Sequence, residues 1–191
     1  MAFRRGFKAE ADRISLRVRE QMGLCAVDPL DPAKVCAHFD IVLLKLSELN
    51  CNASAFLGAH SSSFSAMTVP YGLQTAIVHN DSHHPYRQRS NICHELAHLF
   101  LGHQSAPPLT EAGERVRDGG IEAEANFLSG TLLIPNEAAR HIVRRRLQMT
   151  AQNMYGVSQP MLDYRLRVSG ALTIHSRFVD AAQKHRGPKW Q

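Results

Sequence analysis

The spacing of apolar residues predicts two helices before residue 40. Ile14, Val18 and Met22 recur every four positions within residues 10–22, so they share one helical face. Asp31 followed by Pro32 is typical of a helix start, because aspartate caps free N–H groups and proline suits the first turn. A short second helix is therefore expected directly after Asp31.

Short apolar runs bounded by turn residues come next, which is the pattern of β-strands. The runs are IVLLKL (41–46), ASAFLGAH (53–60), FSAMTVP (64–70) and TAIVHN (75–80). Together they predict a small antiparallel sheet.

The pattern turns helical again at Pro85, which suits a helix start, and apolar residues then recur at helical spacing as far as Gly102. The polar segment 103–120 holds two adjacent prolines and a Gly-Gly pair, and it predicts a loop that covers a site or is mobile. Residues 121–135 predict a second buried helix, in which Gly130 allows close helix packing.

The last third is expected to be helical, and residues 150–170 resemble a helix-turn-helix. Gly156 marks the turn, Ser158 opens the second helix, and Leu162 and Leu166 lie on its inner face. With the sheet before it, this arrangement predicts the α+β class.

Composition limits the class of protein. Of the 191 residues, 44% are hydrophobic and 20% are charged, which is ordinary for a soluble globular chain. The four cysteines show no C-x-x-C pair, no export signal precedes them, and no apolar run reaches the roughly 20 residues of a membrane span. We therefore expect a soluble, cytoplasmic protein with reduced thiols.

The net charge of +5 is concentrated in basic runs at residues 3–8, 144–146 and 184–190. Such runs are typical of solvated surface, and the alternative is contact with nucleic acid or an acidic partner.

The stretch NICHELAHLFLGH, residues 91–103, carries the candidate chemistry. His94 and His98 are four positions apart, so on a helix both imidazoles can reach one Zn²⁺ ion. Glu95 flanks that position and is placed to act as a general base. The alternative is a chance match on an ordinary helix, but the apolar flanks imply burial, and buried histidines and glutamates need partners.

A third ligand is available in EAEAN, residues 122–126. Glu122 and Asn126 share one helical face, so Glu122 could complete a His₂Glu site with an open fourth position. Asn126 would then accept the N–H of a ligating histidine as a second-shell partner. Glu124 is the rival ligand, and Glu122 is favoured because only it has this partner. A solvated acidic pair at a helix start is the alternative.

The chain resembles the ImmA/IrrE-type metallopeptidases in HELAHLFLGH, EAEANFLSGTLLIP and AQNMYGVSQPMLDYRL, over roughly residues 31–168. The resemblance implies a zincin-like protease unit of the gluzincin type, with His94, His98 and Glu122 binding one Zn²⁺ ion and Glu95 as the base. It also implies the short form of the family, without a C-terminal sensor domain. Ser129 and Gly130 depart from the alanines more common in the family, which affects packing more than chemistry.

The resemblance further implies three parts of the chain: a metallopeptidase core (1–135), a helix-turn-helix-like segment packed on it (136–175), and a basic tail (176–191). The implied function is cleavage of a helix-turn-helix repressor that controls phage, mobile-element or stress-response genes. The protein substrate would be that repressor, and no membrane partner is expected.

Metal-assisted peptide hydrolysis with Glu95 as the base also needs a hydrogen-bond donor for the oxyanion of the tetrahedral intermediate. Candidates for this role or for substrate contacts are His103, His79, Tyr164 and Arg165. The sequence does not rank these candidates well. His103 is a weak one, because continuing the helix places it more than two turns from His94; a helix cap or a surface position suits it better.

Three further residues near the motif have simpler roles. His83 and His84 are expected in a loop before the helix, and Cys93 is expected to be a small buried thiol.

Two other functions remain open. In a DNA-binding regulator, Gln159, Arg165 and Arg167 would read bases, although Asp163 would oppose phosphate. In a zinc-binding interaction protein, the ion would be held with little proteolytic activity. The His₂Glu set also admits divalent ions other than zinc.

Overall fold

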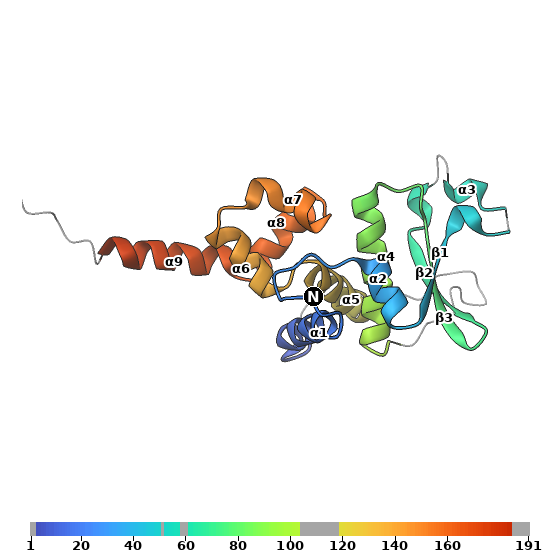
Figure 1. Cartoon of the computed structure of the whole chain (residues 1–191), viewed down its shortest axis with the longest axis horizontal. Coiled ribbons are helices and arrows are strands. Elements are labelled where there is room, and N and C mark those ends of the chain that lie inside the picture. Colours follow the sequence, from blue (N-terminus) through green and yellow to red (C-terminus); the bar gives the residue numbers. More distant parts are fainter. Residues whose placement is uncertain (1–2, 51, 58–60, 104–118, 185–191) are drawn as a thin grey trace, which may run out of the picture.

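The computed structural model describes residues 3–50, 52–57, 61–103 and 119–184 (Figure 1). A small sheet lies at one end of the molecule, the long helix α4 stands beside it, and the remaining large helices follow on the other side of α4. In chain order the elements are α1 (Phe7–Gln21), α2 (Pro32–His38), β1 (Ile41–Lys45), η1 (Leu46–Glu48), α3 (Ser54–Leu57), η2 (Ser61–Ser63), β2 (Ala66–Tyr71), β3 (Gln74–His79), α4 (Pro85–Phe100), α5 (Gly119–Leu133), α6 (Asn136–Arg144), α7 (Gln148–Tyr155), α8 (Gln159–Val168) and α9 (Ala171–Lys184). The predicted α+β class is confirmed.

The sheet is mixed, so the prediction of a wholly antiparallel sheet was wrong for one strand. Its order is β1-β3-β2, with β2 antiparallel to β3 and β1 parallel to β3. The turn at Gly72, whose φ is +62°, joins β2 to β3 as a hairpin. Strands β1 and β2 lie at opposite edges and run in opposite directions, so β3, which reverses the direction of β2, is parallel to β1.

The segment ASAFLGAH is not a strand where it is described. Ser54–Leu57 forms the short helix α3, and residues 58–60 lie outside the described part of the chain. Asn52 accepts hydrogen bonds from the Ser54 backbone N–H and hydroxyl at 3.4 and 2.7 Å, a local pattern that favours a helical turn. A short apolar run does not distinguish helix from strand, which explains the error.

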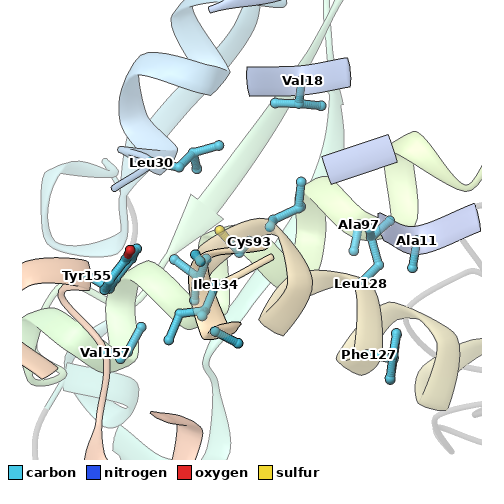
Figure 2. Packing of buried hydrophobic residues seen from close by; sticks show 14 of the residues in the cluster. Ala11, Val18, Leu30, Cys93, Ala97, Phe127, Leu128, Ile134, Tyr155 and Val157 are labelled. Atoms are coloured by element: carbon cyan, nitrogen blue, oxygen red, sulfur yellow. The ribbon is translucent and has the colours of Figure 1, made fainter. Parts of the chain in front are cut away.

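The main core forms between α1, α4, α5 and the C-terminal helices (Figure 2). Val18 of the expected α1 face is buried, but the face is centred on Phe7, Ala11 and Ser15 rather than on Ile14. Phe7 packs edge-on against Phe127 of α5 with a ring-centroid distance of 5.8 Å. The sequence period therefore identified the helix and a face that packs on the core, since Ile14 and Met22 also contact it while partly exposed.

Helices α7 and α8 form the expected helix-turn-helix-like pair. Gly156 adopts a φ of +61° at the turn, and the Ser158 hydroxyl caps α8 by accepting the Met161 N–H. Helix α8 lies close to α5 at Gly130, where an added Cβ would meet Arg165 Cδ at 3.1 Å and Met161 Sδ at 3.2 Å. The predicted close packing at Gly130 is thereby confirmed.

The three-part division of the chain stays a prediction. Helix α9 runs from Ala171 to Lys184 and projects away from the other helices (Figure 1). The segment 104–118, expected to be a loop, and the end of the basic tail at 185–191 lie outside the described residues.

Candidate metal centre

Local sequence signals define both ends of α4. Pro85 occupies the first helical turn, and His84, expected in a loop, is its N-cap and accepts the Tyr86 N–H at 3.2 Å. At the other end Gly102 has a φ of +65°, and the N–H groups of Gly102 and His103 donate to the carbonyls of Leu99 and His98. This pair of bonds is a Schellman motif, which folds residue 103 back onto the last turn.

Helices α4 and α5 bring three potential ligands together. Nε2 of His94 lies 3.0 Å from Nε2 of His98. Glu122 Oε2 lies 3.4 Å from Nε2 of His94, and Glu122 Oε1 lies 3.7 Å from Nε2 of His98. Within the described part of the chain, this is the group of histidine, cysteine and acidic side chains arranged to hold a metal ion.

These distances fit one tetrahedral ion. Two ligand atoms held about 2.0–2.1 Å from Zn²⁺ at tetrahedral angles are separated by about 3.3 Å, close to the three measured separations. All three side chains are partly exposed, so a fourth position is accessible to water. The residues present therefore fit a catalytic His₂Glu site, and zinc is the metal that this donor set commonly binds.

Glu124, the rival ligand, points to another side of α5. Its two carboxylate oxygens share the single Nε–H of Arg4, at 3.1 and 3.2 Å, and the carboxylate lies 3.9 Å from Nε2 of His103. The geometry favours Glu122 over Glu124 as the third ligand, and the role of each remains a prediction.

The electrostatics of His98 suit a metal ligand. Burial, together with the neighbouring His94 and His103 rings, lowers the pKa of His98 to about 4. The imidazole is therefore neutral near pH 7, which is the form that binds a metal ion.

Glu95 lies beside this cluster and is held by the sheet. Its Oε2 accepts a hydrogen bond of 2.7 Å from the hydroxyl of Thr68 on β2. Burial raises the pKa of the Glu95 carboxyl, while the bond from Thr68 and the nearby His94 act in the opposite direction. A raised pKa brings a carboxyl closer to the range in which it both accepts and returns a proton near neutral pH.

A cavity of about 540 Å³ opens next to His94. Its lining includes Asn91 of α4, Asn126 of α5 and Tyr164 of α8. Asn126 thus lies near the proposed ligands, and its predicted bond to a ligating histidine stays a prediction. Tyr164 also remains a candidate for contact with a substrate.

His103 caps the helix end through its backbone, as expected, but its ring packs against His98 instead of lying on the surface. Its Nδ1 lies 3.0 Å from Nδ1 of His98, and its side chain is only 10% exposed. The expectation of a surface position came from continuing the helix as far as residue 103, whereas the left-handed Gly102 ends α4 and returns His103 to the preceding turn. The L-G-H sequence after the motif was the signal for this placement.

Arg165 is a core residue and does not face the cavity as a substrate contact. It is fully buried, and its guanidinium donates to the Ile134 carbonyl at 2.8 Å and to the Asn136 side chain at 3.0 Å. Gly130 leaves the space that this long side chain occupies.

Among the described residues, the remaining candidates His79, His83 and Cys93 lie outside the three-ligand group. His79, at the end of β3, is 4% exposed, and His83 contacts the Asn91 amide at 3.1 Å through Nδ1. Cys93 is fully buried, as expected, and burial raises the pKa of its thiol to about 12.

Thr68 is the residue near the site that the sequence did not indicate. It lies 27 positions before Glu95 in an ordinary strand pattern, and only the packing of β2 beside α4 brings the two together.

The fold and the site together define a class of protein. A small mixed sheet supports an H-E-x-x-H helix, and the neighbouring helix supplies a carboxylate to the two histidines. This combination is that of a zincin-like metallopeptidase unit.

The comparison with protein families agrees with this class. The family model described as the IrrE N-terminal-like domain, a peptidase family, matches residues 36–167. The chain belongs to this family. A search of curated proteins found no match. Among the described helices, none has the length and apolar character needed to cross a bilayer.

Proposed function

We propose that the protein is a zinc-dependent endopeptidase in which His94, His98 and Glu122 hold the ion and Glu95 is the general base. The observation that carries the proposal is the convergence of the three ligand atoms beside the partly buried carboxylate of Glu95. Four side chains from two helices meet in the arrangement required for metal-assisted hydrolysis, which a chance H-E-x-x-H match would not produce.

The residues have distinct tasks in this reaction. A metal ion held by His94, His98 and Glu122 would supply Lewis-acid polarisation of the scissile carbonyl and would make the attacking water more acidic. Glu95 takes a proton as the water attacks the carbonyl carbon, and it returns that proton to the amine when the C–N bond breaks. One water is consumed for each peptide bond. Thr68 holds the carboxylate of Glu95 at 2.7 Å, ready for both transfers.

The surroundings suit an extended peptide. Strand β2 forms an edge of the described sheet, and its Thr68 contacts Glu95, so a peptide paired with this edge would lie next to the site. The cavity beside His94 can receive a side chain of the peptide, and Tyr164 on its wall is the candidate donor to the oxyanion.

The protein substrate in this proposal is a helix-turn-helix repressor, cleaved in the control of phage, mobile-element or stress-response genes. This part rests on the resemblance of the three sequence motifs, and a cytoplasmic location follows from it. The direct candidate is a repressor encoded beside the gene for this chain.

Contacts within α8 weigh against the DNA-binding alternative. Arg165 is buried in the core, and Gln159 donates to Asp163 at 2.8 Å along the same helix. Two of the polar groups that would contact bases are therefore already engaged. Met161 and Tyr164 of α8 also line the cavity beside His94, which supports a role of this segment next to the catalytic unit.

The test combines metal content with cleavage. The wild-type protein is expected to bind one zinc ion and to cleave the neighbouring repressor. Glu95→Gln should keep the ion and lose roughly 10²–10⁴-fold in kcat, because general base catalysis contributes about that factor. Glu122→Gln should lose zinc affinity.

Each alternative has its own result. Cleavage at the wild-type rate by Glu95→Gln would exclude Glu95 as the base. Bound zinc without cleavage of any tested repressor would favour the interaction protein. Salt-dependent binding to a duplex, without cleavage, would favour the DNA-binding regulator.

A further inference from the structure

A line of polar contacts runs from the proposed metal site to the N-terminal segment. Nδ1 of His98 lies 3.0 Å from Nδ1 of His103, whose Nε2 lies 3.9 Å from Glu124. Glu124 in turn accepts a bifurcated hydrogen bond from the Nε–H of Arg4. The line therefore joins α4, α5 and the start of the chain.

The chemistry of imidazole assigns a direction to the contact between the two rings. A histidine that presents Nε2 to a metal ion carries its proton on Nδ1 and donates it to a neighbouring acceptor. In His98 that proton points at His103 Nδ1, which must then be the unprotonated, accepting nitrogen of its ring. The proton of His103 consequently lies on Nε2, the nitrogen that faces the Glu124 carboxylate.

The backbone places the His103 ring for this contact without depending on it. The His103 N–H donates to the His98 carbonyl at 3.0 Å, and Gly102 supplies the left-handed turn that makes this bond possible. Any residue other than proline can make the backbone bond at position 103, since it uses no side-chain atom. The helix end and the contact between the rings are therefore separable by mutation.

Glu124 is held in place by Arg4 on the side away from His103. Arg4 contacts both Glu124 and Glu10, so its guanidinium is fixed between two carboxylates. This arrangement leaves Glu124 as an acceptor facing His103 and keeps it apart from the three ligand atoms.

We propose that His103 and Glu124 are positioning residues for the metal site: His103 accepts the Nδ1 proton of His98, and Glu124 orients His103. This inference rests on the proposed function in one respect, namely that His98 binds the ion through Nε2. It extends that function by giving the second acid of the E-A-E sequence a separate task, in line with carboxylate–histidine–metal arrangements in which an outer group orients the ligand.

The experiment measures the zinc dissociation constant of the purified full chain by competition with a chromophoric chelator. His103→Ala removes the acceptor and is expected to weaken zinc binding by about 10–100-fold. His103→Asn places an amide oxygen near the position of Nδ1, so it is expected to recover most of the wild-type affinity. Exposed His38 on α2 provides the matched control, and His38→Ala should bind zinc like the wild type.

Glu124→Gln tests the outer part of the line. It keeps the shape and removes the charge that orients His103, so a several-fold weaker dissociation constant is expected, with one zinc ion still bound. Glu10→Gln removes the other acidic partner of Arg4 and should leave the dissociation constant unchanged. Melting temperatures of the zinc-free variants check the fold, and they should stay at the wild-type value while zinc affinity changes.

Three results would overturn the inference. Wild-type affinity in His103→Ala would show that the ring does not position His98, even though the metal site itself stands. An equal loss in His103→Asn and His103→Ala would exclude the acceptor role. A wild-type protein that binds no divalent ion would overturn the proposed function, and the inference with it.

Discussion

The α4–α5 pair and the α7–α8 pair both carry polar side chains on closely packed helices, and the molecule uses them in opposite ways. In the first pair, His94 and Glu122 remain 23% and 39% exposed and their polar atoms face one another, and His94 also lines a cavity. In the second, Arg165 is fully buried and donates to groups at the end of α5 and the start of α6. Polar residues on a helix thus form a candidate site where they remain exposed to solvent. Where another helix buries them, they have a structural role.

Among the described residues, the buried guanidinium has hydrogen-bond partners for Nε and Nη2, none for Nη1, and no acidic partner in contact. Besides its hydrogen bonds to the Ile134 carbonyl and to Asn136, it lies over the Phe127 ring, 5.3 Å from the centroid. Burial lowers the pKa of Arg165 to about 10, so it stays charged at neutral pH. Its interactions are therefore those of a structural cation that joins α8 to α5 and α6.

The largest expected difference between the two helix pairs is their response to zinc. Binding to the folded state alone stabilises a protein by RT ln(1 + [L]/Kd), about 4 kcal/mol when free zinc is a thousand times Kd. Zinc should therefore raise the free energy of unfolding of the wild type by that amount, seen as a higher melting temperature. The melting temperature of His94→Ala should not change with zinc. Arg165→Ala should still shift, because its side chain has no part in holding the ion. A wild-type melting temperature that does not change with zinc would contradict the assignment of the α4–α5 pair as a metal site.

Removing Arg165 is the next largest effect. Arg165→Ala is expected to lower the free energy of unfolding by roughly 3 kcal/mol, since it leaves a cavity and unsatisfied acceptors in the core. Arg167→Ala, on the exposed face of the same helix, should change it by less than about 0.5 kcal/mol. Urea denaturation measures both, and equal values for the two variants would argue against a scaffolding role for Arg165.

A smaller effect tests the contact between Gly156, in the turn between α7 and α8, and Arg89 of α4. Gly23→Ala should cost about 1 kcal/mol, because Gly23 has a φ of +68° and open space around it. Gly156→Ala should cost about 1 kcal/mol more, since its φ is +61° and an added Cβ would also meet Arg89 Nε at 2.6 Å. The difference between the two variants in urea denaturation isolates the contact with Arg89. Equal costs would show that Arg89 moves aside freely.

The sequence by itself determined the features that depend on short spacing. His94 and His98 are four residues apart, as are Glu122 and Asn126, so the helical period places each pair on one face. Pro85 and Gly102 mark the ends of α4. The helix-turn-helix-like pair was equally local, because Gly156 and Ser158 act within a few residues. Such features need no knowledge of what packs against them.

Only the tertiary structure decided which polar groups meet. The bond from Thr68 to Glu95, the burial of Arg165 and the direction of β1 depend on segments far apart in the chain, and no local pattern encodes such pairings. His103 belongs to the same group for a subtler reason: one left-handed residue at Gly102 reverses its direction and brings its ring to His98. Periodicity places residues along one helix, while contacts between elements depend on how their faces pack.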